Sequence, residues 1–444
     1  MTRLAPLLLS VISISVLAGL LLAVESIAAP GGGSSGFGGG GGGGGGSGGF
    51  SGGGGAGSGS GGGSPLIILV VFGVVAVFFV FGLFKAAQLR KRRRERAARV
   101  ELASAEAAGD DAYFAADLVK AEAAALHRAI VAAWTGRDRA ALAALLGPDL
   151  LTEWVLRLDD FDRKGWHNVC ELRSGPEVEY MGLVNREDDA DDRVVVRVTA
   201  VLRDVVLDAA GRMLKRNEED DELTTLAEYW TLGRAGERWQ LLSIEQDAEG
   251  AHHLDAPIVA SPWSDEARLH DDAVTELAVA DAVPEEAVGE LVDVDYAGTA
   301  RLQAMDLSVV DGRFAPAVLE AAARRAVEAW AEAVDGADAA LERAATPEAA
   351  HALLYPRGTN TRLVVRGPRL QVLRIAALDA QSQPPTMVVE AELRGRRYLE
   401  DRDTAAVLEG SKDRETAFTE RWTLALADDD PATPWRIVAT AAVG

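Results

Sequence analysis

The stretch EYWTL, residues 228–232, returns 192 residues later as ERWTL, residues 420–424. In each copy the Glu, the Trp and the Leu stand at every second position, so they share one face of a strand. Apolar residues alternating in this way are typical of a sheet that is buried on one side. The two stretches therefore predict two similar sheets within one chain of 444 residues.

Further landmarks extend the repeat beyond these strands. Apolar helical rows begin at Phe114 and Phe314, 200 residues apart, and Gly175-Pro176 matches Gly367-Pro368 at a separation of 192 residues. A nearly constant separation with small steps is what a duplication followed by loop insertions leaves behind. Each copy has its helical patterns first and its alternating patterns afterwards, which predicts an α+β fold with helices packed on an antiparallel sheet.

The first 64 residues carry two patterns that are typical of export. An apolar run from Leu4 to Val24 is followed by small residues at Ser26 and Ala28, the −3 and −1 positions of a possible cut after Ala28, as in a cleaved signal peptide; the alternative is an uncleaved first membrane helix. Residues 31–64 hold 24 of the 46 glycines. Such a Gly/Ser tract cannot bury enough apolar area to fold, so we expect a flexible tether outside the membrane.

Residues 66–84, LIILVVFGVVAVFFVFGLF, contain no charge. A helix of this length spans ~28 Å, about one hydrocarbon core, which predicts a transmembrane helix. Because positive residues beside a membrane helix stay on the cytoplasmic side, the C-terminal domains should be cytoplasmic, at the cell membrane. The basic collar, which we expect to contact anionic lipid, consists of Lys85, Arg90, Lys91, Arg92, Arg93, Arg94, Arg96 and Arg99.

Charge is distributed unevenly along the chain. Residues 1–99 carry a net charge of +7, and the remaining residues carry −30, within a total of −23. A body this acidic lacks the basic face that general nucleic-acid binding requires, so no nucleic-acid partner is expected. The single cysteine, Cys170, excludes an internal disulfide framework and a multi-cysteine metal site.

The predicted organisation, in chain order, is a signal peptide or first membrane helix at 1–29, a Gly/Ser-rich disordered tract at 30–65, a transmembrane helix at 66–84, the basic collar at 85–110, copy 1 at 111–250, an acidic connector at 251–312 and copy 2 at 313–444.

This order of segments, with EYWTL at 228–232 and WQLLSIE at 239–245, resembles bacterial members of the family named for subunit 44 of the mitochondrial inner-membrane translocase. The resemblance covers residues 1–250, and copy 2 is assigned through its match to copy 1. It implies a nuclear transport factor two-like cone, a curved antiparallel sheet around helices with a pocket between them. As ligands it implies membrane-bound or translocating polypeptides, or lipid.

Two carboxylates are the candidates for a group inside such a pocket. Glu228 shares a strand face with Trp230, and Glu420 shares one with Trp422. Desolvation raises the pKa of a carboxyl on an apolar face unless a cation pairs with it. In a pocket, each carboxylate would orient a ligand or an incoming basic peptide.

The structural alternative is a buried carboxylate that pairs with an arginine such as Arg203 or Arg197. Both copies keep the Glu, but no histidine or nucleophile repeats with it, so we expect no enzyme. His252 and His253 are adjacent, and adjacent side chains diverge on a strand or a helix, so we expect no metal site and no cofactor. Cys170 is expected to be a small buried hydrophobe.

These observations together predict a membrane-anchored, non-catalytic binding or scaffold protein that assists protein translocation or membrane-protein assembly. One alternative is a cone-fold enzyme that acts on a small apolar substrate with Glu228 or Glu420 as its base. The other is a signalling or envelope assembly factor that senses through its Gly-rich tract. The sequence leaves the ligand and the oligomeric state open.

Overall fold

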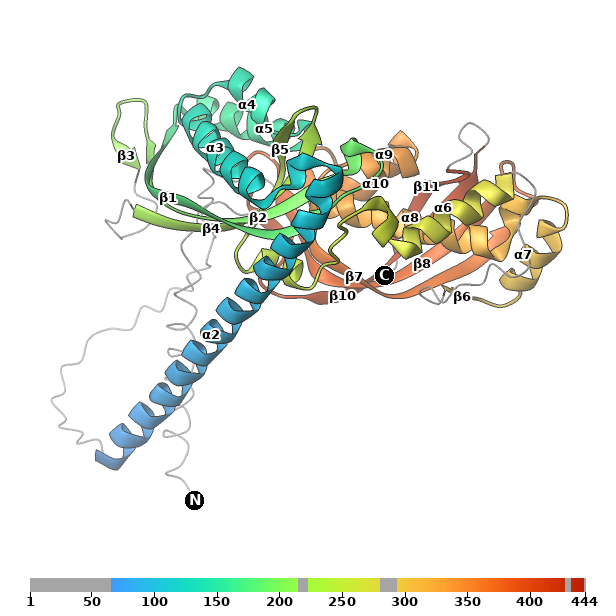
Figure 1. The fold of residues 1–444 in the computed structure, drawn as a ribbon, viewed down its shortest axis with the longest axis horizontal. Helices are drawn as coiled ribbons and strands as arrows, with labels where there is room; N and C mark the ends of the chain where they lie inside the picture. The colour runs from blue at the N-terminus through green and yellow to red at the C-terminus, as the bar shows by residue number, and fades with distance from the viewer. Residues whose placement is uncertain (1–64, 215–222, 280–293, 428–432, 443–444) are drawn as a thin grey trace, which may run out of the picture.

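A computed structural model of the chain describes residues 65–214, 223–279, 294–427 and 433–442. The predicted signal segment and the Gly/Ser tract lie outside these residues. The described part contains two units, each with helices packed on an antiparallel sheet, and one long helix that projects from them (Figure 1). The α+β expectation is therefore confirmed.

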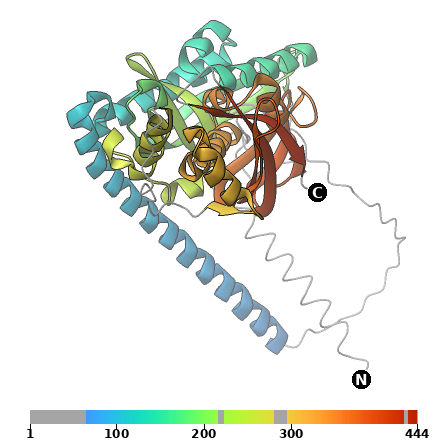
Figure 2. The same cartoon turned by 90° about the vertical axis from the view of Figure 1, so that its right-hand side faces the viewer.

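Helix α2, Pro65–Asp110, contains both the predicted membrane segment and the basic collar. The side chains of residues 65–79 lie outside the description, and within what is described no helix is long and apolar enough to cross a membrane. The transmembrane segment at 66–84 therefore stays a prediction. The C-terminal part of α2 packs on the first unit and buries Val100 and Ala107, while its N-terminal part extends away from the body (Figure 2).

The first unit contains residues 112–246. Its helices are η2 (Ala112–Phe114), α3 (Ala116–Thr135), α4 (Arg139–Leu145) and α5 (Pro148–Lys164). Its strands are β1 (His167–Val184), β2 (Arg193–Leu207), β3 (Met213–Leu214), β4 (Leu223–Ala235) and β5 (Arg238–Gln246). The sheet order is β1-β2-β4-β5, with β3 beside β2, and η3 (Asp189–Asp191) lies between β1 and β2.

The second unit repeats this plan after a connecting region. Its helices are η6 (Gly312–Phe314), α8 (Pro316–Asp335), α9 (Ala339–Ala344) and α10 (Pro347–Leu354). Its strands are β7 (Thr361–Asp379), β8 (Thr386–Asp401), β9 (Val407–Gly410), β10 (Thr416–Leu426) and β11 (Trp435–Ala442). The order is β11-β10-β8-β7-β6, where β6 (Val294–Tyr296) comes from the connecting region and pairs with β7 in parallel.

Equivalent contacts show that the two units are built alike. Phe114 packs edge-on against Trp239 with ring centroids 5.6 Å apart, and Phe314 packs against Trp435 at the same distance. The sequence repeat therefore corresponds to a structural repeat.

The described part of the connecting region contains η4 (Glu249–Leu254), η5 (Pro262–Ser264), α6 (Glu266–Val279) and α7 (Ala300–Ser308). Leu254 of η4 packs with Met181 and Tyr229 of the first unit. Helix α6 lies along α8 of the second unit, where Val274 and Ala278 pack with Ala315 and Val318. These segments therefore pack on both units.

Candidate functional site

The first predicted carboxylate, Glu228, is buried on β4 and only 1% exposed. Its Oε2 accepts a hydrogen bond of 2.9 Å from Trp230 Nε1, and its Oε1 has no hydrogen-bond partner among the described residues. Burial raises the pKa of Glu228 to about 8. Glu228 is therefore largely protonated at neutral pH.

The prediction that Arg197 or Arg203 pairs with Glu228 is wrong. Arg197 lies opposite Tyr229 and Arg203 lies opposite Leu223, whereas Glu228 lies opposite Val198. A difference of one residue in a strand reverses the face on which a side chain lies, so both arginines are on the other face of the sheet. Arg197 pairs there with Asp247 at 2.7 Å.

The second predicted carboxylate, Glu420, has a different environment. It is only partly buried, and Arg397 Nη2 approaches its Oε1 to 3.9 Å. Burial raises its pKa, and the charge of Arg397 partly offsets that effect. Trp230 and Trp422 are both fully buried core residues. The two units therefore share the position of this Glu but not its surroundings.

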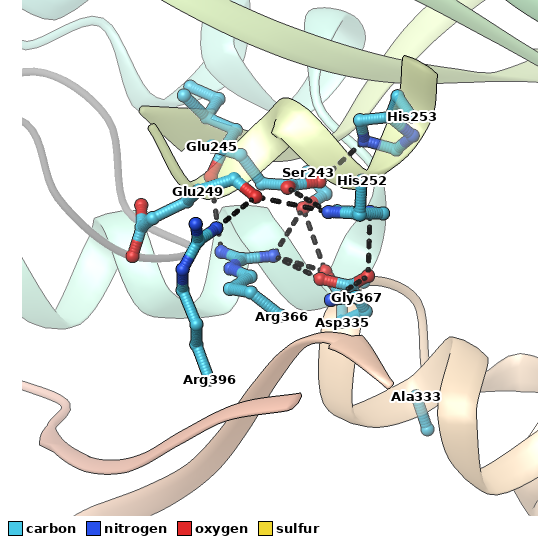
Figure 3. A network of polar contacts seen from close by, with 12 residues as sticks. Ser243, Glu245, Glu249, His252, His253, Ala333, Asp335, Arg366, Gly367 and Arg396 are labelled. Atoms are coloured by element: carbon cyan, nitrogen blue, oxygen red, sulfur yellow. Dashed lines mark hydrogen bonds and ion pairs between the residues drawn. The ribbon is translucent and has the colours of Figure 1, made fainter. Parts of the chain in front are cut away.

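The contact between the two units contains a buried polar network around Arg366 of β7 (Figure 3). The Arg366 side chain is 0% exposed. Its Nη1 donates to Ser243 Oγ of the first unit at 3.1 Å and to both the backbone oxygen and Oδ1 of Asp335. Its Nη2 donates to the backbone oxygen of Ile244 at 3.1 Å. One guanidinium therefore joins β5 of the first unit to α8 of the second.

Two adjacent histidines on η4 lie beside this network. His253 Nε2 is 2.8 Å from Glu245 Oε1, and His252 Nε2 is 3.4 Å from Asp335 Oδ2. Burial opposes the charge on Glu245, but His253 and His252 hold its pKa well below the usual value. Burial likewise lowers the pKa of His253, and the adjacent Glu245 outweighs this and raises it.

The prediction that these histidines diverge is wrong, because their ring centroids are 4.0 Å apart. Successive residues of a 3₁₀ turn such as η4 lie ~120° apart, so the backbone geometry alone does not bring the two rings together. The ring of Tyr229 stacks on His253 at 5.6 Å. Gly367 leaves room for His252, since a Cβ at residue 367 would lie 2.7 Å from the His252 Cβ.

Further contacts join the two units beside the histidines. Arg396 Nη1 donates to the backbone oxygen of Glu249 at 2.8 Å, and Tyr398 Oη donates to Glu249 Oε1 at 3.3 Å. On another side, Arg402 Nε donates to the buried Glu153 at 2.8 Å. Buried charges that pair across a contact hold it in one geometry, because separating them would leave an uncompensated charge.

A cleft of about 1040 Å³ lies between the units, next to the network. Nine of its lining residues are Asp or Glu and five are Arg, so with neutral histidines it carries an excess of four negative charges. Two ion pairs bridge the units at the cleft, Arg193 with Glu332 at 2.7 Å and Arg343 with Asp191 at 2.9 Å. The Glu328 side chain is exposed there and has no ion pair within the described residues. Desolvation by the cleft raises the pKa of its carboxyl, and the charge of Arg268 partly offsets that effect.

The basic collar divides into two sets of residues. Arg92 and Arg93 form ion pairs with Asp255 and Asp247, at 2.7 and 2.6 Å. Arg96 is 3% exposed and donates to the backbone oxygen of Met181 at 2.7 Å. These three arginines attach α2 to the body. Lys85, Arg90, Lys91, Arg94 and Arg99 are exposed and form no ion pair with the described part of the body, and Arg92 is exposed although it is paired.

Cys170 is buried and 3% exposed, as expected. Sequence reasoning missed Arg366 as a functional candidate. The available signal was a charged residue directly after the apolar run Leu363 to Val365, which predicts a buried cation that needs partners. Asp335 is 31 positions away, and the partners in the first unit, Ser243 and Ile244, are more than 100 positions away, so local patterns cannot name them.

Comparison with known proteins gives a family for the first unit. The chain matches no curated protein. One solved structure, that of the intermembrane space region of the chloroplast protein ARC6, is 14% identical and covers 28% of this chain and 95% of its own, with a TM-score of 0.21. A TM-score this low carries no argument about this chain. Residues 100–246, in contrast, match the sequence profile of the Tim44-like domain family, and the chain therefore carries a Tim44-like domain over these residues.

Proposed function

We propose that the chain is a membrane-anchored, non-catalytic protein that binds basic polypeptide segments in the cleft between its two units. The setting would be protein translocation or membrane-protein assembly at the cytoplasmic face of the cell membrane, as the Tim44-like domain favours. The observation that carries the proposal is the acidic cleft, because a polar network holds its two walls together.

The chemistry of the cleft supports a basic peptide as the occupant. Its negative excess favours a cationic ligand, and its exposed Glu328 offers an unpaired carboxylate. Leu242 and Ile258 add apolar surface to the cleft. A volume of about 1040 Å³ reaches the upper end of ordinary small-molecule pockets, which run to ~1,000 Å³, so several side chains fit.

Helix α2 supports the proposed location. Arg92, the first arginine that contacts the body, follows residue 84, the end of the predicted membrane segment, by eight positions. At about 1.5 Å per helical residue the body would lie ~12 Å from the bilayer. A continuous helix fixed by Arg93 and Arg96 would keep that distance nearly constant, and the exposed collar residues would face the lipid.

An enzymatic role is the weaker alternative. A general base must be ionised and within reach of its substrate. Glu228 is buried and its pKa is raised to about 8, so it holds its proton at neutral pH. Neither Glu228 nor Glu420 lines the cleft. The positions and protonation of these two carboxyl groups therefore favour a binding role over a catalytic role.

A binding titration tests the proposed ligand. Fluorescence anisotropy of a labelled Lys/Arg-rich peptide should rise with added full-length protein in detergent, and a Glu/Asp-rich peptide of equal length should not bind. Glu328→Lys should weaken binding about tenfold, because repulsion in place of attraction near a protein surface is worth ~1–2 kcal/mol. Glu392→Lys, at an exposed position outside the cleft, is the control. Equal binding of both peptides would contradict the proposal.

A truncation tests the anchor. A chain that begins at residue 86 keeps the arginines that attach α2 to the body, whereas a chain that begins at residue 100 loses them. We expect the full chain to resist carbonate extraction from membranes and the chain from residue 86 to be released. Retention of that shorter chain in the membrane would show that the predicted membrane segment at 66–84 is not the principal anchor.

A further inference from the structure

The side chains of Glu245, His252 and His253 form a compact set of metal-ligand atoms at the wall of the cleft (Figure 3). One oxygen or nitrogen atom of each lies within 4.8 Å of the others. Glu245 comes from β5, and both histidines come from η4. We propose that these three residues bind a divalent transition-metal ion, and that zinc is the ion their chemistry fits.

The donor set favours zinc over the harder cations. Two imidazole nitrogens and one carboxylate oxygen are a common ligand set for zinc, whereas calcium and magnesium prefer oxygen ligands throughout. Three protein ligands leave one position for water or for a group of a bound ligand. All three residues line the cleft, which gives an ion a route from solvent.

The charges around the cluster leave the carboxylate of Glu245 available to the proposed metal ion. The nearby guanidinium of Arg366 contacts Asp335, so these two charges balance each other. Glu245 is only 2% exposed, and its Oε2 has no hydrogen-bond partner in the described part of the chain. That oxygen is 3.5 Å from His252 Nδ1, so the unsatisfied atom points toward the histidine pair.

The surroundings also orient the histidines. His252 Nε2 is 3.4 Å from Asp335 Oδ2, and its Nδ1 is 3.5 Å from Glu245 Oε2 and 3.0 Å from the backbone oxygen of Glu249, a hydrogen bond that a bound ion would replace. A carboxylate bound to the second ring nitrogen is the usual support for a metal-binding histidine. The ring of Tyr229 holds His253, and the absence of a side chain at Gly367 gives His252 its space.

Isothermal titration of the chelator-treated full chain in detergent with zinc chloride tests the proposal. We expect one equivalent of zinc to bind and visible d–d absorption when cobalt replaces zinc. His253→Ala and His252→Ala should each weaken zinc binding at least about tenfold, in line with the 10–100-fold effect of disturbing even a supporting residue. His351→Ala, at an exposed position on α10, should leave it unchanged.

Thermal unfolding in the presence of chelator separates loss of the site from loss of the fold. A His252→Ala protein that keeps the Tm of the chelator-treated parent but loses zinc binding would support the site. The proposal is overturned if the parent binds no zinc at ~100 µM, or if both histidine variants bind zinc as tightly as the parent. The first result would leave the cluster as a hydrogen-bonded ion-pair network only.

Discussion

Replacing Arg366 by methionine tests whether the buried network holds the two units together. Methionine keeps much of the length of the side chain but removes every donor. The change would leave the backbone oxygen of Ile244 and the carboxylate of Asp335 without their cation. Breaking a buried ion pair from one side costs about 3–5 kcal/mol, a large fraction of a typical folding free energy of ~5–15 kcal/mol.

Arg369→Met is the matched control for this change. Arg369 lies three residues further along β7 and pairs with Glu415 at 2.7 Å, but its side chain is 52% exposed. An exposed pair of this kind contributes ~1 kcal/mol or less, so the control should cost little. The two variants therefore differ in burial and in contact with the other unit, while the residue exchanged is the same.

Urea unfolding of the full chain in detergent, followed by tryptophan fluorescence and by circular dichroism, measures both effects. The parent should unfold in one coincident transition, because the units share the network. Arg366→Met should unfold at lower urea in two transitions that the probes report differently, which is the sign of uncoupled units. A single transition for Arg366→Met, within about 1 kcal/mol of Arg369→Met, would refute the role given to the network.

Three further predictions address other parts of the fold. Native Glu228 keeps its proton up to about pH 8, whereas the unfolded carboxyl loses it near pH 4.5. The unfolding free energy should therefore fall by up to ~1.4 kcal/mol per pH unit as the pH rises between these values. Glu228→Gln should remove that slope in urea titrations carried out across the same pH range. Gly367→Ala should lower the unfolding free energy by more than Gly358→Ala. Both glycines have positive φ, but only the Cβ added at residue 367 meets a side chain, that of His252 at 2.7 Å. Equal losses of unfolding free energy would show that backbone strain alone is responsible. Arg96→Ala should make α2 more sensitive to trypsin than Arg94→Ala does, because Arg96 hydrogen-bonds the body and Arg94 is exposed.

The repeat of the two sheets could be predicted because it rests on local patterns. The alternation around Trp230 and Trp422 and the constant separation of the landmarks need only neighbouring residues and a count along the chain. The packed pairs Phe114 with Trp239 and Phe314 with Trp435 confirm that the copies are equivalent. The fold class was therefore accessible from the sequence.

The polar network around Arg366 could not be predicted from the sequence in the same way. Its partners are distant in sequence, since Arg366 reaches Ser243 over 123 residues. The predicted pairing of Glu228 with an arginine does not form, because the strand register places Arg197 on the opposite face of the sheet. The sequence leaves that register undetermined. The prediction for the two histidines was wrong because it considered only the directions set by the backbone, whereas their rings lie 4.0 Å apart on the 3₁₀ turn at Glu249–Leu254.

Hydrogen–deuterium exchange of the full chain with and without the Lys/Arg-rich peptide tests the central claim most directly, because it locates the bound ligand. The account predicts slower exchange in the cleft segment 242–268, which runs from β5 of the first unit into the connecting region, and in segment 325–344 of the second unit, with little change on β9 and β10, which do not line the cleft. Protection confined to one unit away from the cleft, or no protection at a saturating peptide concentration, would contradict the claim that the two units bind a basic polypeptide between them.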